Sequence, residues 1–194
     1  MARVRPICSI RKTSNGFTLL ELIIVLVIAA ILGTYATVSL NKSILHNQLQ
    51  KASFETLAQL SSIRPLALKN DSRMLVRFST SDCSVYVDKN GDTTAQANEY
   101  SHSWKLNERV LFGLPSNPRP GTAPAGAQLP SAGKLAAGQW SKLFVVDNDA
   151  LGTINPGCVF LYAPKLPGKV YCISSFTSQA LKIYSWNGGT WSVQ

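Results

Sequence analysis

The chain has 194 residues, enough for an N-terminal segment and one domain with a modest core. Hydrophobic residues make up 45% of the sequence and charged residues 15%, which excludes a disordered chain as a general description. The net charge is +9, but Arg3, Arg5, Arg11 and Lys12 all precede residue 17, so the remaining chain is only mildly basic.

An apolar run follows this basic leader and covers residues 16–41. Its one charged residue is Glu21, and the next is Lys42. About 20 uncharged residues suffice for a helix that crosses the hydrocarbon core of a bilayer. A carboxylate at the edge of such a span costs on the order of 2.5 kcal/mol or more, so Glu21 needs a partner. The basic leader predicts a cytoplasmic N-terminus and an exported domain after Lys42.

An amphipathic helix is expected to continue this apolar run. Apolar residues recur on one helical face at spacings of three, four and eight, namely Leu45, Leu49, Ala52, Leu60 and Ile63. A single apolar face predicts packing against the rest of the chain. Pro65 disfavours the helical conformation of Arg64, so the helix is expected to end or kink near these two residues.

The remainder predicts an antiparallel β-sheet packed on the second half of the helix, which makes the fold class α+β. β-Branched and aromatic residues dominate six short segments, at residues 74–78, 84–87, 143–146, 158–162, 170–173 and 181–186. Residues 113–141 are rich in proline, a composition typical of a poorly ordered or functional loop. The predicted organisation is a leader at 1–16, a membrane half at 17–41, an amphipathic half at 42–68 and a β domain at 69–194.

Three cysteines follow the leader, and an exported domain can hold disulfides. A hairpin centred near Lys165 would set Cys158 opposite Cys172, so these two are the preferred pair. Cys83 would then remain a thiol, although the pairing among the three stays open. Metal binding by the cysteines is less favoured, because no CxxC or histidine-rich spacing accompanies them.

Four oxygen-bearing residues occupy positions 1, 3, 5 and 12 of a calcium-loop spacing: Asp88, Asn90, Asp92 and Glu99. Position 6 is Thr93 instead of the glycine that such a loop needs, and a strand precedes the loop where a helix is usual. An Asn-Gly hairpin turn explains the segment without any ion and is the favoured interpretation. Calcium is the alternative, and no other cofactor is expected.

Three lysines near aromatic residues suggest nucleic-acid binding, since cations neutralise phosphates and aromatic faces stack on bases. The residues are Lys165, Lys169 and Lys182, with Tyr184, Trp186 and Trp191. Arginine is scarce in this part of the chain, and aromatic residues in strands more often belong to the core, so this hypothesis is secondary. His46 and His102 are expected at the surface. No P-loop, Gly-x-Ser-x-Gly or HExxH pattern occurs, so an enzyme is not expected.

The segment GFTLLELIIVLVIAAILG resembles the class III signal peptide of the type IV filament superfamily, the pilins and pseudopilins. The resemblance implies that a prepilin peptidase cuts between Gly16 and Phe17 and methylates the new amino group. It also implies that Glu21 pairs with the positive N-terminus of a neighbouring subunit, which would supply its missing partner. The implied architecture is the pilin fold, inserted in the inner membrane and assembled there by a platform of other proteins.

Residues 151–191 are similar, more loosely, to the GspH/FimT group of minor pilins and pseudopilins. The matching positions near the end are Tyr184, Trp186, Gly188, Gly189 and Trp191. Two features depart from the group: Ser178-Gln179 stands where a Gly-Arg turn is common, and the insertion at 113–141 has no counterpart. The resemblance implies a structural subunit of a type IV pilus or a type II secretion pseudopilus, in the tip or initiation complex. A DNA-binding minor pilin for DNA uptake is the alternative.

Overall fold

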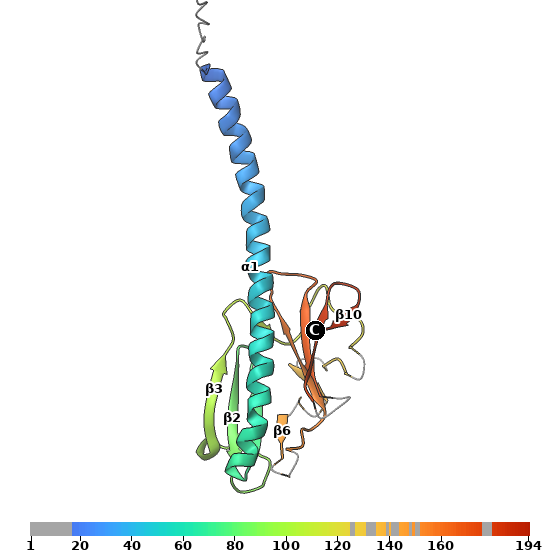
Figure 1. The fold of residues 1–194 in the computed structure, drawn as a ribbon. Coiled ribbons are helices and arrows are strands. Elements are labelled where there is room, and N and C mark those ends of the chain that lie inside the picture. Colours follow the sequence, from blue (N-terminus) through green and yellow to red (C-terminus); the bar gives the residue numbers. More distant parts are fainter. Residues whose placement is uncertain are drawn as a thin grey trace, which may run out of the picture. The chain divides into compact units, whose positions relative to one another are not determined.

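The computed structural model describes residues 17–124, 127–130, 135–138, 140, 144–147, 149, 152–175 and 180–194 (Figure 1). The chain forms two compact units, Met1–Leu40 and Asn41–Gln194. The predicted leader, including Gly16 of the predicted processing site, lies outside the described residues, and so does the Ser178-Gln179 departure.

Helix α1 spans Leu19–Asn70 and contains Pro65, so the predicted end near Arg64 is wrong. A proline in a helix interior removes one backbone donor and costs roughly 3 kcal/mol. The turn beyond Pro65 packs Leu66 and Ala67 against the core. This burial, together with a hydrogen-bonded end, offsets the cost of the proline.

The end of α1 is a Schellman cap. Asp71 adopts a left-handed conformation with φ 46°. The N–H of Ser72 donates to the carbonyl of Ala67 over 3.2 Å, and the N–H of Asp71 donates to the carbonyl of Leu68 over 3.4 Å. These are the two bonds that satisfy the last carbonyls of a helix in this motif. Aspartate is tolerated at the left-handed position, so the cap forms without glycine.

Two antiparallel sheets follow α1 instead of the single sheet expected, and the α+β class is confirmed. The first sheet has the order β3-β2-β1-β6, formed by β1 (Arg73–Phe78), β2 (Asp82–Asp88), β3 (Tyr100–Lys105) and β6 (Phe144–Val146). The second has the order β10-β9-β8-β7-β4, with β5 also paired to β7. Its strands are β4 (Leu111–Phe112), β5 (Ala136–Gly138), β7 (Gly157–Tyr162), β8 (Val170–Ser174), β9 (Lys182–Trp186) and β10 (Trp191–Val193). A 3-10 turn, η1 (Ala97–Glu99), precedes β3.

The core of the second unit joins the amphipathic part of α1 to both sheets (Figure 1). The five residues predicted to form the apolar helical face, Leu45, Leu49, Ala52, Leu60 and Ile63, are all buried. Strand β7 is buried on both faces. Val159 and Leu161 face the main core, whereas Cys158 and Phe160 belong to a second cluster with Trp186. Burial on both faces explains the unbroken apolar run of this strand.

Four strands were not expected: β3, β4, β5 and β10. Strand β3 is mostly exposed and, among the described strands, pairs with β2 alone, so its sequence lacks an apolar alternation. Strand β5 lies inside the segment 113–141 that was expected to be poorly ordered. Within the described part of that segment, Arg119 Nη2 donates to the carbonyl of Pro130 over 3.3 Å. Trp191 Nε1 also donates to the carbonyl of Thr122 over 2.8 Å, which ties this segment to β10.

Candidate functional site

The N-terminus of α1 begins with a hydrogen-bonded cap. Thr18 is the N-cap, and its Oγ1 accepts the backbone N–H of Glu21 over 3.2 Å. The Thr-x-x-Glu spacing is that of a capping box, in which the residue at the third helical position helps to satisfy the free N–H groups. The Glu21 carboxylate also lies at the positive end of the helix dipole, which favours it there. Glu21 thus contributes its backbone N–H to the cap, and its carboxylate lies where the helix dipole favours a negative charge, a local feature not predicted from the sequence.

The first unit presents an apolar helix surface. Every residue from 17 to 40 is exposed, including Phe17 at 79%. Helix α1 has an 18-residue window with a mean hydropathy of 2.5, none of it buried, so it is long and apolar enough to cross a membrane. So large an exposed apolar surface is not stable in water and requires lipid or another protein around it.

Two threonine hydroxyls in this segment are hydrogen-bonded within the helix itself. Thr34 Oγ1 donates to the carbonyl of Ile31 over 2.7 Å, and Thr37 Oγ1 donates to the carbonyl of Thr34 over 2.8 Å. These bonds remove the cost of placing hydroxyl groups in an apolar medium. The Glu21 carboxylate differs, since none of the ion pairs among the described residues includes it. Glu21 is thus the charged group in this segment for which a partner must come from elsewhere.

The second candidate site is the loop that joins β2 to β3. Asp88, the last residue of β2, accepts the N–H of Gly91 at Oδ1 over 2.7 Å and the N–H of Thr93 at Oδ2 over 3.2 Å. Gly91 and Thr93 have φ angles of 75° and 56°. The connection runs from Asp88 to Tyr100, so the two-residue Asn-Gly hairpin is wrong. The loop is instead wound around the Asp88 carboxylate.

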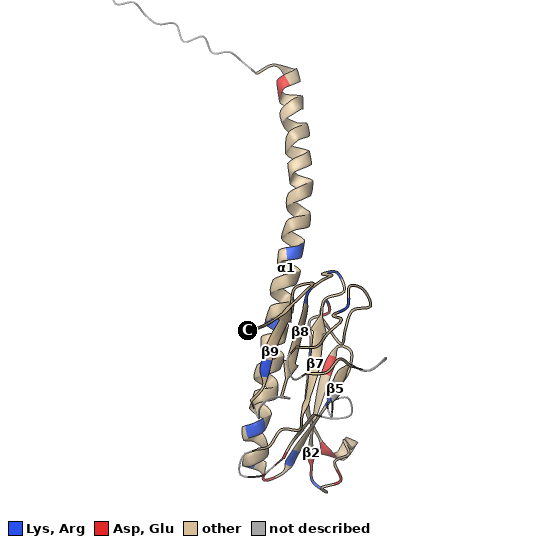
Figure 2. Ribbon diagram, turned by 90° about the vertical axis from the view of Figure 1, so that its right-hand side faces the viewer, with Lys and Arg blue, Asp and Glu red and all other residues tan. Residues whose placement is uncertain are grey.

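Three of the four predicted ligands come together in this loop. Asp88, Asp92 and Glu99 each offer a carboxylate oxygen, and these oxygens lie within 4.8 Å of one another. Asn90 instead bonds to Asp92: its Nδ2 donates to Oδ2 of Asp92 over 3.1 Å, and its Oδ1 accepts the N–H of Asp92 over 3.0 Å. Asn90 therefore orients Asp92. Figure 2 shows acidic positions gathered beside β2.

Cys158 and Cys172 lie on one face of the β7–β8 hairpin but are not directly opposite. Cys158 is opposite Ser174, and Cys172 is opposite Phe160. The predicted centre of the hairpin at Lys165 is therefore wrong by one residue, and the two cysteines are diagonal neighbours across β7 and β8. Both are buried and, like Cys83, are not in a disulfide. Burial raises the pKa of Cys172 well above its usual value, with a further contribution from Cys158. Their pairing under oxidising conditions stays a prediction.

The three lysines of the nucleic-acid hypothesis do not form one patch. Lys169 precedes the first residue of β8, whereas Lys182 pairs with the last residue, Ser174. Lys169 is five residues before Ser174 along the chain, which puts the two lysines about 17 Å apart along the strand. Tyr184 and Trp186 are buried in the second cluster and are not available for stacking. Basic positions lie apart from one another in Figure 2, and the structure does not favour a nucleic-acid interface.

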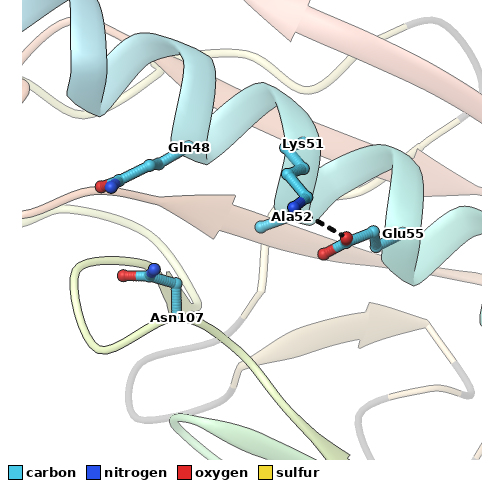
Figure 3. Close-up of a pocket in the computed structure, with 5 residues that line it drawn as sticks. All are labelled: Gln48, Lys51, Ala52, Glu55 and Asn107. Atoms are coloured by element: carbon cyan, nitrogen blue, oxygen red, sulfur yellow. Dashed lines mark ion pairs between the residues drawn. The ribbon is translucent and has the colours of Figure 1, made fainter.

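A groove of about 210 Å³ lies between α1 and the loop after β3 (Figure 3). Its lining residues are Gln48, Lys51, Ala52, Glu55 and Asn107. Lys51 and Glu55 form an ion pair of 3.6 Å on the helix surface, with side chains 75% and 63% exposed. Exposed pairs of this kind contribute little to stability. The groove offers no nucleophile and no pair of facing carboxylates, the groups expected of a hydrolytic active site.

Residues 11–37 match the model of the prokaryotic N-terminal methylation motif. This match confirms the resemblance of the N-terminal segment to a class III signal peptide. No curated protein sequence matches the chain. These residues include the predicted cleavage position between Gly16 and Phe17, the cap at Thr18 and the carboxylate of Glu21.

Two solved structures resemble the chain, and both are of the minor pseudopilin EpsH from the type II secretion system of Vibrio cholerae. One has a TM-score of 0.44 and 12% sequence identity, over 71% of this chain and 93% of that chain. The other has a TM-score of 0.40 and 14% identity, over 75% and 94%. These values are too low to carry an argument about the β domain.

Proposed function

We propose that the chain is a structural subunit of a type IV filament, either a minor pilin of a pilus or a minor pseudopilin of a type II secretion system. One observation carries the proposal. The methylation motif covers residues 11–37, and its described part, from residue 17 on, is exposed throughout and enters helix α1 at Leu19. The same helix supplies residues to the core of the second unit. A secreted enzyme with a removable signal would not need this continuity.

Processing is the first step of the proposed function. A prepilin peptidase removes residues 1–16 and methylates the amino group of Phe17. The new N-terminus directly precedes the Thr18 cap, and its positive charge lies next to the positive end of the helix dipole. Glu21 is one helical turn away from this amino group, so the motif places opposite charges close together at one end of α1.

Assembly is the second step. Residues 19–40 anchor the subunit in the inner membrane first and then pack against the same segments of other pilin or pseudopilin subunits. Both surroundings are apolar, so one exposed apolar surface suits both. A carboxylate in such surroundings is stable when an opposite charge pairs with it. We propose that the Phe17 amino group of a neighbouring subunit pairs with Glu21 and sets the register between subunits.

The orientation follows from the charge of the leader. Arg3, Arg5, Arg11 and Lys12 precede the span, and basic residues favour the cytoplasmic side. The β domain would then lie in the periplasm and, after assembly, on the outside of the filament. Placement in the tip or initiation complex rests on the resemblance of residues 151–191 to minor subunits, and the assembly platform is the expected partner at the membrane.

Mass spectrometry of the membrane-purified protein tests the proposal. The expected intact mass is that of residues 17–194 plus one methyl group, with N-methylated Phe17 as the first residue. The same chain from cells that lack prepilin peptidase is the control, and it should retain residues 1–16. An N-terminus at any other position in cells that contain the peptidase would refute the processing step.

A further inference from the structure

We infer that Asp88, Asp92 and Glu99 bind a calcium ion in the loop between β2 and β3. Carboxylate oxygens of the three residues lie within 4.8 Å of one another. Asp88 and Glu99 are only 5% and 2% exposed, so water screens their charges poorly. Three like charges at this separation repel one another, and a cation bound between them would attract each carboxylate and outweigh this repulsion.

Glu99 gives the strongest indication that a ligand belongs here. Its Oε1 accepts the backbone N–H of Lys89 over 3.1 Å, whereas its Oε2 is buried with no hydrogen-bond partner. Buried carboxylate oxygens are normally hydrogen-bonded or bound to a metal, because a bare one loses its hydration without compensation. A metal ion among the three carboxylates would supply the partner that Oε2 lacks.

Arg73 does not neutralise the whole group. Its Nη1 lies 3.6 Å from Oδ2 of Asp88, and its Nε bonds to Oδ1 of Asp147 over 2.6 Å. The guanidinium is therefore shared between one carboxylate of the cluster and one outside it. The ion pairs among the described residues include neither Asp92 nor Glu99. One shared positive charge against three carboxylates leaves an excess of at least two negative charges, which a divalent cation matches.

The donor atoms select calcium among divalent cations. All three residues offer oxygen, the ligand type of hard cations, and neither sulfur nor imidazole belongs to the group. Magnesium demands near-octahedral geometry and keeps most of its waters, whereas calcium accepts irregular oxygen sites in loops. The separations of four residues from Asp88 to Asp92 and seven from Asp92 to Glu99 are those of positions 1, 5 and 12 in a calcium loop.

The conformation of Thr93 shows that the loop does not need a glycine at position 6. Thr93 occupies position 6, where calcium loops have glycine, yet its φ of 56° is the left-handed conformation for which glycine is used there. The loop therefore turns at the expected position despite the threonine. The backbone N–H bonds to both oxygens of Asp88 and to Oδ1 of Asp92 use one acceptor direction of each oxygen and leave others for an ion. Oδ2 of Asp92 already accepts two side-chain amides, from Asn90 over 3.1 Å and from Gln96 over 2.6 Å, so Oδ1 is the Asp92 oxygen left for the ion.

Calcium titration of the full-length protein in detergent tests this site. Isothermal titration with calcium chloride should give one site with a Kd on the order of 10⁻⁴ to 10⁻³ M, the range of extracellular calcium modules. Calcium at about ten times the Kd should raise the Tm by about 3 to 6 °C, and EGTA should reverse the rise. Magnesium chloride at the same concentration should give a much smaller shift.

Two variants and one matched control complete the test. Glu99→Gln and Asp92→Asn should each weaken calcium binding at least about tenfold and abolish the calcium-dependent rise in Tm. Glu55→Gln makes the same chemical change at an exposed helix position and should leave calcium binding unchanged. No binding to the wild-type protein at about 10 mM calcium would overturn the inference. An equal rise in Tm for wild type and both variants would also overturn it, since the ion would then bind elsewhere.

Discussion

Cys158 stands directly opposite Ser174 across strands β7 and β8, and not opposite Cys172. The carbonyl of Phe160, two residues along β7, accepts the N–H of Gly113, which lies on the side of β7 away from β8. Because backbone bonding alternates along a strand, Cys158 and Ser174 form a pair without direct hydrogen bonds to each other, with Cα atoms about 4.5 Å apart. That separation is within the range of a disulfide, whereas diagonal positions are about 7–8 Å apart.

Ser174→Cys should therefore form a disulfide with Cys158 on air oxidation. The new cysteine is directly opposite its partner, so little backbone movement is needed. Peptide mapping without reductant is the measurement, with the wild-type protein treated identically as the control. A variant in which Cys158 is linked to Cys172 in preference to the new cysteine would contradict the register described above.

Gly157→Ala should destabilise the β domain by about 1–3 kcal/mol or more. A Cβ at this position would lie 2.2 Å from ring carbons of Trp140, a contact that forces the indole to move. The indole is held by a bond of 2.8 Å from its Nε1 to the carbonyl of Asn155 and by edge-on packing against Phe144. Urea unfolding of the detergent-solubilised protein measures the change.

Gly189→Ala is the matched control for that substitution. A Cβ at Gly189 meets no atom within 4 Å, and its φ is not in the left-handed region. We expect a change within about 0.5 kcal/mol, as for most surface substitutions. Equal effects of the two substitutions would show that the Trp140 contact is unimportant.

Acidification should destabilise the second unit through His46. Desolvation lowers the pKa of His46 from its usual value of 6.5, and the nearby Lys169 lowers it further. Its Nδ1 is also buried without a partner. The lower pKa in the folded protein means that His46 binds a proton more readily in the unfolded chain. The stability that neutral His46 provides is therefore fully present above pH 6.5. It is lost as the pH falls from 6.5 through the pKa of His46 in the folded protein.

His46→Gln should remove this part of the pH dependence. Urea unfolding at a series of pH values between about 4 and 8 measures it, and His102→Gln, at an exposed position, is the control. We expect a flatter stability profile for His46→Gln and an unchanged profile for His102→Gln. The same slope in wild type and His46→Gln would assign the acid sensitivity to other groups.

The elements that were correctly predicted from the sequence are those whose apolar residues are periodic and are buried in the core. The helical face from Leu45 to Ile63 and the central strands β1, β7 and β8 are examples, because burial itself selects their residues. Strand β3 was missed because an exposed edge strand is held by backbone pairing, which leaves no apolar signature. The end of α1 was misplaced because Pro65 was weighed without the packing and the cap that follow it.

The candidate sites were predictable to different degrees. Glu21 and the cleavage position were visible because they belong to a linear motif. The three loop carboxylates were visible as a spacing, but the burial of Glu99 and its unpartnered oxygen depend on tertiary packing and leave no local signal. The capping role of Thr18 had a signal in the Thr-x-x-Glu pattern, which the long apolar run beside it obscured.

The charge of Glu21 is central to the proposed function, and Glu21→Gln separates it from the local role of the residue. The bond to Thr18 uses the backbone N–H of residue 21, so it is kept in the variant, and glutamine also suits the third position of a capping box. It carries no charge, so it cannot form an ion pair with a neighbouring Phe17 amino group. Glu21→Ala removes both the charge and the polar side chain and is the companion variant.

Incorporation of the Glu21→Gln protein into sheared filaments or pseudopili tests the central claim most directly. Quantitative immunoblotting should compare the filament fraction with the membrane fraction for wild type, Glu21→Gln and Glu21→Ala. We predict that all three proteins insert in the membrane in similar amounts and that both variants are strongly depleted from the filament fraction. Glu21→Gln in filaments at the wild-type level would contradict a role for the carboxylate charge in assembly.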